Sequence, residues 1–168
     1  MSCNQSLGGL TKDCSRSMGG IAEVWIANHD EVKATLSTNK ISSISDVSTF
    51  KKYFFRKGTG SMTHTYNIDP TTGANYVTTD LALQFNKMET AKRVEICALA
   101  VNELSVIVKD CNGIYWYLGY DNPVVATAAD GATGQAFTDA NKYGITLQDN
   151  SLELPYEVDP SALESIIE

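Results

Sequence analysis

The chain has 168 residues, of which 43% are hydrophobic and 20% are charged, so it can bury the core of one domain and is not globally disordered. Thirteen Lys and Arg against twenty Asp and Glu give a net charge of −7, which argues against a general nucleic-acid binder, because such proteins carry a basic excess. No apolar run approaches the roughly 18 residues of a membrane-spanning helix, and the first residues lack the basic and apolar regions of a secretory signal. We therefore expect a compact, acidic protein without a membrane partner.

The charge is unevenly placed along the chain. Residues 1–60 hold eight Lys and Arg and five Asp and Glu, a net of +3, whereas residues 61–168 hold five and fifteen, a net of −10. Residues 149–168 contain six acids and no base. Such a split is typical of a solvated face. The alternative is an assembling subunit whose basic patch meets the acidic patch of a neighbour, since complementary charges steer contacts and set their register.

The first half of the chain predicts an arm followed by strands. Residues 1–19 are rich in Gly, Ser and Asn and show no periodicity, so they predict an irregular arm. Residues 21–28 have the β-branched and aromatic composition of a strand, and residues 32–47 predict two weak strands. Alternating residues on both sides of the turn at 69–73 predict a long hairpin over 61–86 with one buried face.

One helix, at about 89–103, interrupts the strands. Asn86 and Glu89 predict a capping box at its start, because Asn accepts from an orphan backbone amide and Glu reaches back. The apolar residues that recur at helical spacing, and so predict the packed face, are Ala91, Val94, Ala98 and Val101. We expect this narrow stripe to pack on a sheet.

The second half predicts two hairpins and an extended end. Asn112-Gly113 is the strongest two-residue hairpin signal, a second hairpin turns at 139–142, and residues 154–158 are extended. The total is about eight or nine antiparallel strands with one flanking helix. We predict a mainly β fold, a β-sandwich or small barrel, with an irregular arm over 1–19, a single β-rich domain over 20–158 and an acidic tail over 159–168.

The sequence holds no motif for catalysis or for a cofactor. The P-loop, the dinucleotide fingerprint and the nucleophile elbow are all missing, and His29 and His64 have no orienting partner in the sequence. The four cysteines form no CxxC pair and do not stand at ligand spacing from the histidines, which argues against a metal site. Cys3 and Cys14 would pair only in an oxidising setting. We expect no enzyme activity and no cofactor.

One basic and aromatic run is the candidate for an interaction surface. Its residues are Lys51, Lys52, Tyr53, Phe54, Phe55, Arg56 and Lys57. Three adjacent aromatic residues place at least one ring on each face of a strand, so one face presents apolar surface outward. The run fits an edge strand protected by lysines, an interface between subunits, or a nucleic-acid contact made by stacking and charge.

Several stretches resemble a known family. Cys3, Cys14 and the run GGIAEVWIA at 19–27 resemble the opening of virion structural proteins from phages that infect Bacteroidales, including crAss-like phages. The later stretches that resemble the same proteins are QFNKM at 84–88, VIVKDCNGIYWYLG at 106–119, Thr133-Gly134 with DANKYGITL at 139–147, and ELPYEV at 153–158. The resemblance spans nearly the whole chain, and its motifs are architectural, without catalytic content.

The resemblance implies a small subunit of the tail or of the head-to-tail region with a tail-tube-like fold, assembled into rings that stack around a DNA channel. Its partners would be copies of itself, neighbouring virion proteins and duplex DNA that passes without specific binding. It would reside in the virion after synthesis in the bacterial host cytoplasm. An acidic surface toward the channel would repel DNA, and segments 51–57 and 149–168 would meet across a contact between rings.

The sequence leaves two other functions open. One is a capsid decoration or fibre-anchoring protein, which would bind the capsid exterior without lining a channel. The other is a carbohydrate-binding module, which would rest on exposed Trp25, Trp116 and tyrosines.

Overall fold

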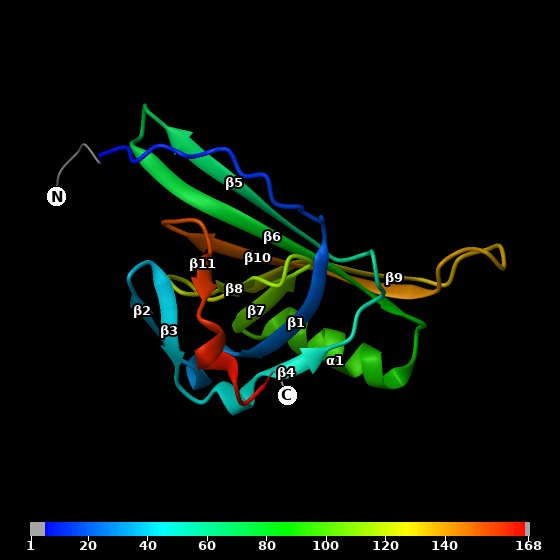
Figure 1. Ribbon diagram of the computed structural model, residues 1–168. Coiled ribbons are helices and arrows are strands. Elements are labelled where there is room, and N and C mark those ends of the chain that lie inside the picture. The colour runs from blue at the N-terminus through cyan, green and yellow to red at the C-terminus, as the bar shows by residue number, and fades with distance from the viewer. Residues whose placement is uncertain (1–5, 167–168) are drawn as a thin grey trace.

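The computed structural model describes residues 6–166, which form two β-sheets, one α-helix and three short 3-10 helices (Figure 1). The strands of the larger sheet are β1 (Ile21–Asn28), β2 (Ala34–Ser37), β3 (Lys40–Ile44), β4 (Lys51–Tyr53), β7 (Leu104–Asp110), β8 (Tyr115–Leu118) and β11 (Tyr156–Val158). Those of the smaller sheet are β5 (Ser61–Asp69), β6 (Ala74–Asn86), β9 (Val125–Ala132) and β10 (Lys142–Ser151). The helices are α1 (Thr90–Val101), η1 (His29–Glu31), η2 (Val47–Thr49) and η3 (Pro160–Leu163).

The strand order is β2-β3-β11-β8-β7-β1-β4 in the larger sheet and β5-β6-β10-β9 in the smaller one. This arrangement confirms the prediction of a mainly β sandwich with one flanking helix, and the two separate sheets select the sandwich over the small barrel. The described residues contain eleven strands rather than eight or nine. The three residues of β4 are too few to show alternation in the sequence. β11 falls within the stretch 154–158 that was predicted to be extended, but its parallel pairing with β3 was not indicated.

The larger sheet is buried on both faces at its centre. Val24 and Ile26 of β1 face the smaller sheet and belong to the core between the sheets. Trp25 and Ala27 of the same strand face the opposite way, into a second core. Strands covered on both faces read as continuous apolar runs, which explains why β1 and β7 show no clean alternation.

The second core is closed by the curled end of the larger sheet and by the chain after β11. Its buried residues include Ile41 of β3, Phe50, and Leu163 of η3, which is 0% exposed. The carboxylate of Asp159 accepts hydrogen bonds from the backbone N–H and the hydroxyl of Ser161 and so caps η3. The segment after Val158 therefore packs on the body.

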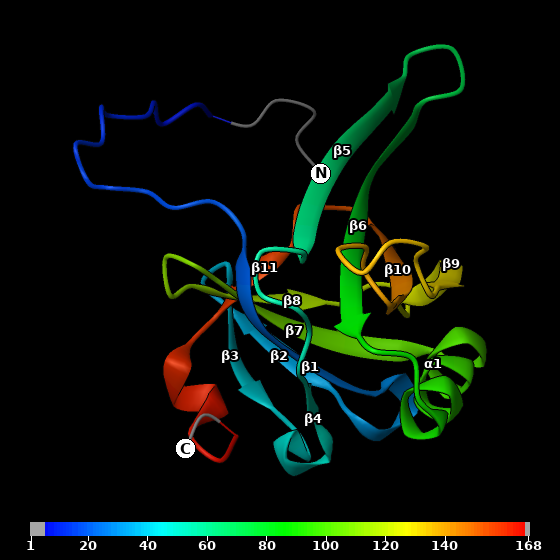
Figure 2. The ribbon, with the colours of Figure 1, turned by 90° about the vertical axis from the view of Figure 1, so that its right-hand side faces the viewer.

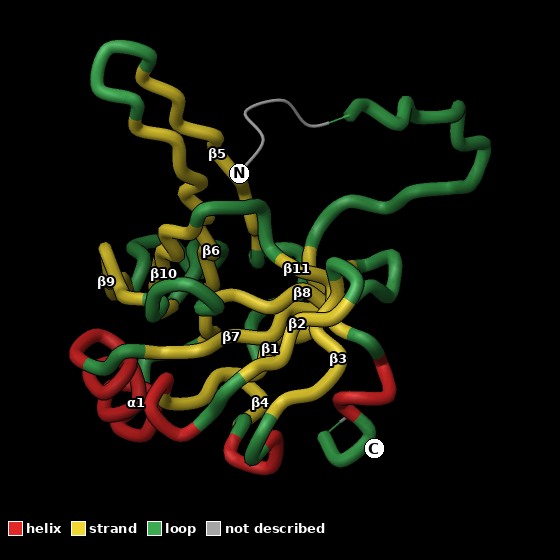
Figure 3. Tube along the Cα trace, turned by 90° about the vertical axis from the view of Figure 1, so that its left-hand side faces the viewer, coloured by secondary structure: helices red, strands yellow, loops and turns green. Residues whose placement is uncertain are grey.

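Two segments project from the sandwich in different directions (Figures 2 and 3). The tip of the hairpin β5–β6 extends beyond the other two strands of the smaller sheet, because β10 pairs with β6 only over 77–86. The arm over 6–19 has no regular structure, and all of its residues are exposed. Cys14 is exposed on this arm, and Cys3, its suggested disulfide partner, lies outside the described residues.

The start of α1 differs from the prediction. Its N-cap is Glu89, which makes no capping hydrogen bond with its side chain. Asn86 still belongs to β6, and Lys87 has a φ of 64°, so the predicted capping box is wrong. The Glu89 carboxylate instead lies 2.8 Å from the ammonium of Lys92, one turn along the helix.

The predicted packed face of α1 is also wrong. The buried residues of the helix are Ile96 and Leu99, whereas Val94 is 54% exposed and Val101 is 82% exposed. Burying Ile96 and Leu99 removes more apolar area from water than burying a stripe of alanines and valines. The helix packs against β9 and β10 in this orientation.

Substitutions on the two faces of α1 are expected to differ strongly in their effect on stability. Leu99→Ala removes a side chain from the core between the sheets and is expected to lower the free energy of unfolding by about 2–4 kcal/mol. Val94→Ala, on the exposed face, is expected to change it by less than about 0.5 kcal/mol. Urea denaturation of both variants measures the difference, and a larger loss for Val94→Ala would contradict this orientation of the helix.

Candidate functional site: a groove beside an edge strand

β4 forms one edge of the larger sheet. It pairs with β1 alone among the described strands, through Val24 to Ile26, so its outer edge carries unpaired backbone groups. Lys51 and Lys52 on this strand are exposed, and lysines on an edge strand discourage unwanted pairing. The edge-strand interpretation is confirmed for 51–53, whereas residues 54–57 continue as a loop.

The three adjacent aromatic rings of this run face different ways, as expected from alternation. Tyr53 and Phe55 pack against the core between the sheets, whereas Phe54 is 80% exposed. The ammonium of Lys52 lies 5.3 Å from the centre of the Phe54 ring and 5.4 Å from that of Trp25, which is close enough for a cation–π attraction to each. One ring is therefore presented outward beside a row of positive charges.

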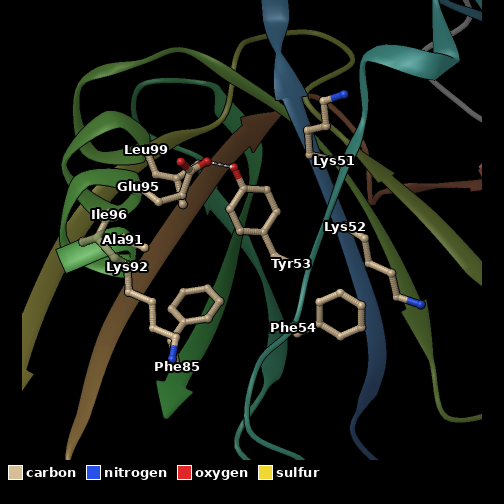
Figure 4. Close-up of a pocket in the computed structure, with 10 residues that line it drawn as sticks. All are labelled: Lys51, Lys52, Tyr53, Phe54, Phe85, Ala91, Lys92, Glu95, Ile96 and Leu99. Atoms are coloured by element: carbon tan, nitrogen blue, oxygen red, sulfur yellow. Dashed lines mark hydrogen bonds between the residues drawn. The ribbon is translucent and has the colours of Figure 1, made fainter. Parts of the chain in front are cut away.

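A groove runs between β4 and α1 (Figure 4) and encloses a cavity of about 370 Å³. Its apolar side chains come from both elements and from the end of β6. The residues that line it are Lys51, Lys52, Tyr53, Phe54, Phe85, Ala91, Lys92, Glu95, Ile96 and Leu99. An apolar depression with a few charged groups at its rim is the usual form of a binding site.

The hydroxyl of Tyr53 donates a hydrogen bond to the carboxylate of Glu95 across the groove (Figure 4). Burial, together with the neighbouring Glu95 carboxylate, raises the pKa of Tyr53, so the phenol stays protonated and remains a donor. Both residues also line a second cavity of about 240 Å³, whose walls include the polar side chains of Asn28, Glu31 and Asn102. The Tyr53–Glu95 contact thus joins the edge strand to the helix between an apolar and a more polar depression.

The rim of the groove carries excess positive charge. Lys52 pairs with Glu23 at 3.2 Å, and Lys92 pairs with Glu89 at 2.8 Å. Within residues 6–166, Lys51, Arg56 and Lys57 have no carboxylate within the 4 Å of an ion pair. These charges are available to an incoming acidic surface.

The acidic stretch 149–168, the expected partner of this basic run, is partly engaged within its own chain. Asp149 is 2% exposed, and Glu157 pairs with Lys40 at 2.8 Å. Asp159 caps η3. Asp149 is therefore removed from the surface and the charge of Glu157 is partly neutralised, whereas Asp159 caps η3 and stays exposed.

His29 begins η1 and His64 lies on β5, and the ring of each is within hydrogen-bond distance of a hydroxyl. Nδ1 of His29 is 3.0 Å from Oγ of Ser105, and Nδ1 of His64 is 2.9 Å from Oγ1 of Thr79. Burial lowers the pKa of His64. Neither ring has a carboxylate among its hydrogen-bond partners within the part of the chain that the structure describes.

Two other kinds of site are absent from the part of the chain that the structure describes. Between residues 6 and 166, His, Cys, Asp and Glu side chains nowhere gather in a group of three that could hold a metal ion. In the same range, no helix has the length and apolar character needed to cross a membrane.

The tryptophans do not form an exposed aromatic platform. Trp25 is 2% exposed in the second core, and half-buried Trp116 donates a hydrogen bond from Nε1 to Asp110 at 3.1 Å. The other carboxylate oxygen of Asp110 accepts from the backbone N–H of Asn112 and Ile114. The expectation of exposed Trp25 is wrong, which removes one of the aromatic residues on which the carbohydrate-binding alternative rested.

Three residues have positions in the structure that the sequence did not predict. Glu95 faces the groove from α1, and Phe137 is fully exposed in the loop between β9 and β10. Asp149 is a carboxylic acid buried between the sheets. A lone aromatic residue among Gly, Ala, Thr and Gln is a signal that would have found Phe137, whereas nothing local distinguishes Asp149 from the exposed acids around it.

No protein-family model and no curated protein matches the chain. Among solved structures, the chain is similar to a chain described as "Virion of native gene transfer agent (GTA) particle". That similarity has 11% identity and a TM-score of 0.40, and it covers 76% of this chain and 98% of the other.

Proposed function

We propose that this protein is a structural subunit of a phage virion that assembles with copies of itself into rings, in the tail tube or the head-to-tail connector. The observation that carries the proposal is the placement of exposed apolar side chains on segments that project from the body. Leu7 and Leu10 on the arm are 98% and 104% exposed, Ile68 near the hairpin tip is 69% exposed, and Phe137 on the β9–β10 loop is 111% exposed.

These side chains do nothing for the fold of the single subunit. The two cores are filled without them, and an extended arm or hairpin gains no burial in an isolated chain. Apolar side chains at the ends of projecting segments can be buried only against another molecule, and we propose that this molecule is a second copy of the chain. Rings form when two different surfaces of one subunit meet and the rotation closes, and this chain offers a receiving groove beside β4 and separate projecting segments.

We propose the virion identity because the stretches quoted above resemble virion structural proteins. Self-assembly of this chain would agree with that role. Residues 61–168, with a net charge of −10, supply an acidic surface that would let duplex DNA pass a channel without sticking, since phosphate contacts dominate DNA affinity. The work of such a subunit is physical rather than chemical. Neighbouring virion proteins are its remaining partners, and it reaches the virion after synthesis in the bacterial host cytoplasm.

Mass measurement and negative-stain imaging of the purified protein test this proposal. We expect open rings or stacked tubes that dissociate as salt rises, because contacts between exposed charges are screened. Compact trimers would favour a capsid decoration or fibre-anchoring protein instead. A chain that stays monomeric at every concentration would contradict self-assembly.

A further inference from the structure

The loop between β9 and β10 is built to hold Phe137 away from the body. The Asp139 carboxylate accepts hydrogen bonds from the backbone N–H of Gln135 and Ala136, at 2.8 and 2.7 Å. Gly134 has a φ of +73°, and a Cβ there would lie 2.5 Å from Cβ of Asp139, so this tight turn requires glycine. The loop is therefore fixed by its own hydrogen bonds and does not depend on contacts made by Phe137.

Phe137 lies between the hydrogen-bonded residues Ala136 and Asp139 of this turn and is 111% exposed. A rigid loop that presents one aromatic side chain loses little conformational entropy on binding. Aromatic anchors of this kind dominate binding energy when they enter a closely fitting, desolvated depression. Phe137 thus has the form of an anchor without a partner in its own chain.

The groove between β4 and α1 matches this anchor in chemistry. The rings of Tyr53 and Phe85 and the side chains of Ile96 and Leu99 line its cavity of about 370 Å³, which is large enough to take one phenyl ring. Aromatic pairs gain further from edge-to-face or offset contacts.

The two surfaces also match in charge. The loop between β9 and β10, residues 133–141, holds Asp139 and no base. The lining of the groove holds three bases, Lys51, Lys52 and Lys92, and one acid, Glu95. Opposite charges around an apolar contact orient the approach and exclude wrong partners.

From this match we infer that Phe137 of one subunit occupies the groove between β4 and α1 of a neighbouring copy. The inference rests on the proposed self-assembly and specifies which surfaces meet. The acidic partner of the basic run 51–57 is then the β9–β10 loop rather than the stretch 149–168.

The first test compares two substitutions in the loop. Phe137→Ala is expected to weaken self-association at least about 30-fold, the size of an interface anchor, with an unchanged melting temperature because the ring contacts nothing in its own chain. Thr138→Ala, its exposed neighbour, is expected to leave the association constant within about threefold. Sedimentation velocity over a concentration series gives both values, and equal association of Phe137→Ala and the original chain would overturn the inference.

The second test detects the contact directly and does not require rings to form. In chains whose native cysteines are replaced by serine, Thr138→Cys in one chain and Ala91→Cys in a differently tagged chain are mixed under mild oxidation. We expect a disulfide-linked heterodimer that is lost when Phe137→Ala is added to the first chain. Thr71→Cys, at the exposed hairpin turn, replaces Ala91→Cys in the control and should give little product.

The two proposals fail in different ways. Assembled rings that give no cross-link through Ala91 would overturn the Phe137 contact and leave self-assembly standing. Cross-linking no stronger through Ala91 than through Thr71 would overturn it as well, whatever the mass of the assembly. A cross-link through Ala91 in a chain that forms only dimers would support the contact and contradict the ring.

Discussion

Reversing the charge of Lys51, Lys52 and Arg56 to Glu is expected to abolish assembly and leave a folded monomer. The three side chains are exposed on or directly after the edge strand, and Lys51 and Arg56 have no carboxylate partner among the described residues. Their reversal would place acids opposite the acidic loop of the neighbour, and like charges brought together at an interface cost several kcal/mol. Measurement of the mass of the particles in solution at low salt distinguishes assembled rings from monomers.

Two controls separate loss of assembly from loss of folding and from a general change in charge. Lys52 pairs with Glu23, so thermal melting must show that the reversed chain still folds. Reversal of Lys33 and Lys109, which lie outside the groove lining, changes the net charge in the same direction and is expected to leave assembly intact. Rings that form equally well from the triple variant would contradict a role for this run in assembly.

The second large effect is expected at Asp149, in the interior of the sandwich. This residue is 2% exposed, its Oδ1 has no hydrogen-bond partner among the described residues, and its Oδ2 accepts only from the backbone N–H of Gly119 at 3.3 Å. Burial, with a smaller contribution from the charge of Asp121, raises the pKa of Asp149 from 3.8 to about 6. The folded chain thus holds a proton that the unfolded chain releases above pH 4.

The sign of the effect on stability follows from this difference. Below the unfolded pKa, Asp149 is protonated in both states, so its ionisation does not change the free energy of unfolding. As the pH rises from about 4 to about 6, the unfolded state ionises first, and the free energy of unfolding falls by about 3 kcal/mol and then levels off. Above about pH 6, the protein is therefore expected to be less stable than below pH 4, because folding buries a carboxyl group that is ionised in the unfolded chain.

Asp149→Asn tests this expectation because the amide oxygen can still accept from Gly119 and the side chain cannot ionise. The variant is expected to be more stable than the original chain by about 2–3 kcal/mol at pH 8 and equal to it near pH 3.5. Urea denaturation at several pH values measures the difference. Asp130→Asn, at an exposed position on β9, is the control, and identical pH profiles for the original chain and Asp149→Asn would contradict the buried-acid assignment.

The local features of the sequence predicted the strands and turns well. The hairpin over 61–86 was predicted from its alternation and its turn, where the Asp69 carboxylate accepts from the backbone N–H of Thr71 at 2.9 Å and Gly73 has a φ of +75°. Asn112-Gly113 was predicted to turn, and Gly113 has a φ of +86°. Such signals act between neighbours in the chain, so the residues themselves contain them.

Features of the helix and of the candidate site depended on contacts between distant segments. The periodicity of α1 allowed a face through Val94 and Val101, and packing on β9 and β10 buried Ile96 and Leu99 instead. The run 51–57 was recognisable as basic and aromatic, but the groove exists only because α1 lies opposite β4.

By itself, the sequence determined the β-rich class, the helix near its middle and the unequal charge of its two parts, because composition, period and turn chemistry are local. The tertiary structure decided which of the charged side chains are free to contact another molecule. It buried Asp149, engaged Glu157 with Lys40 and left Lys51 and Arg56 without carboxylate partners among the described residues. The reason is that desolvation and ion pairing depend on which segments meet in space, and residues far apart in the chain make those contacts.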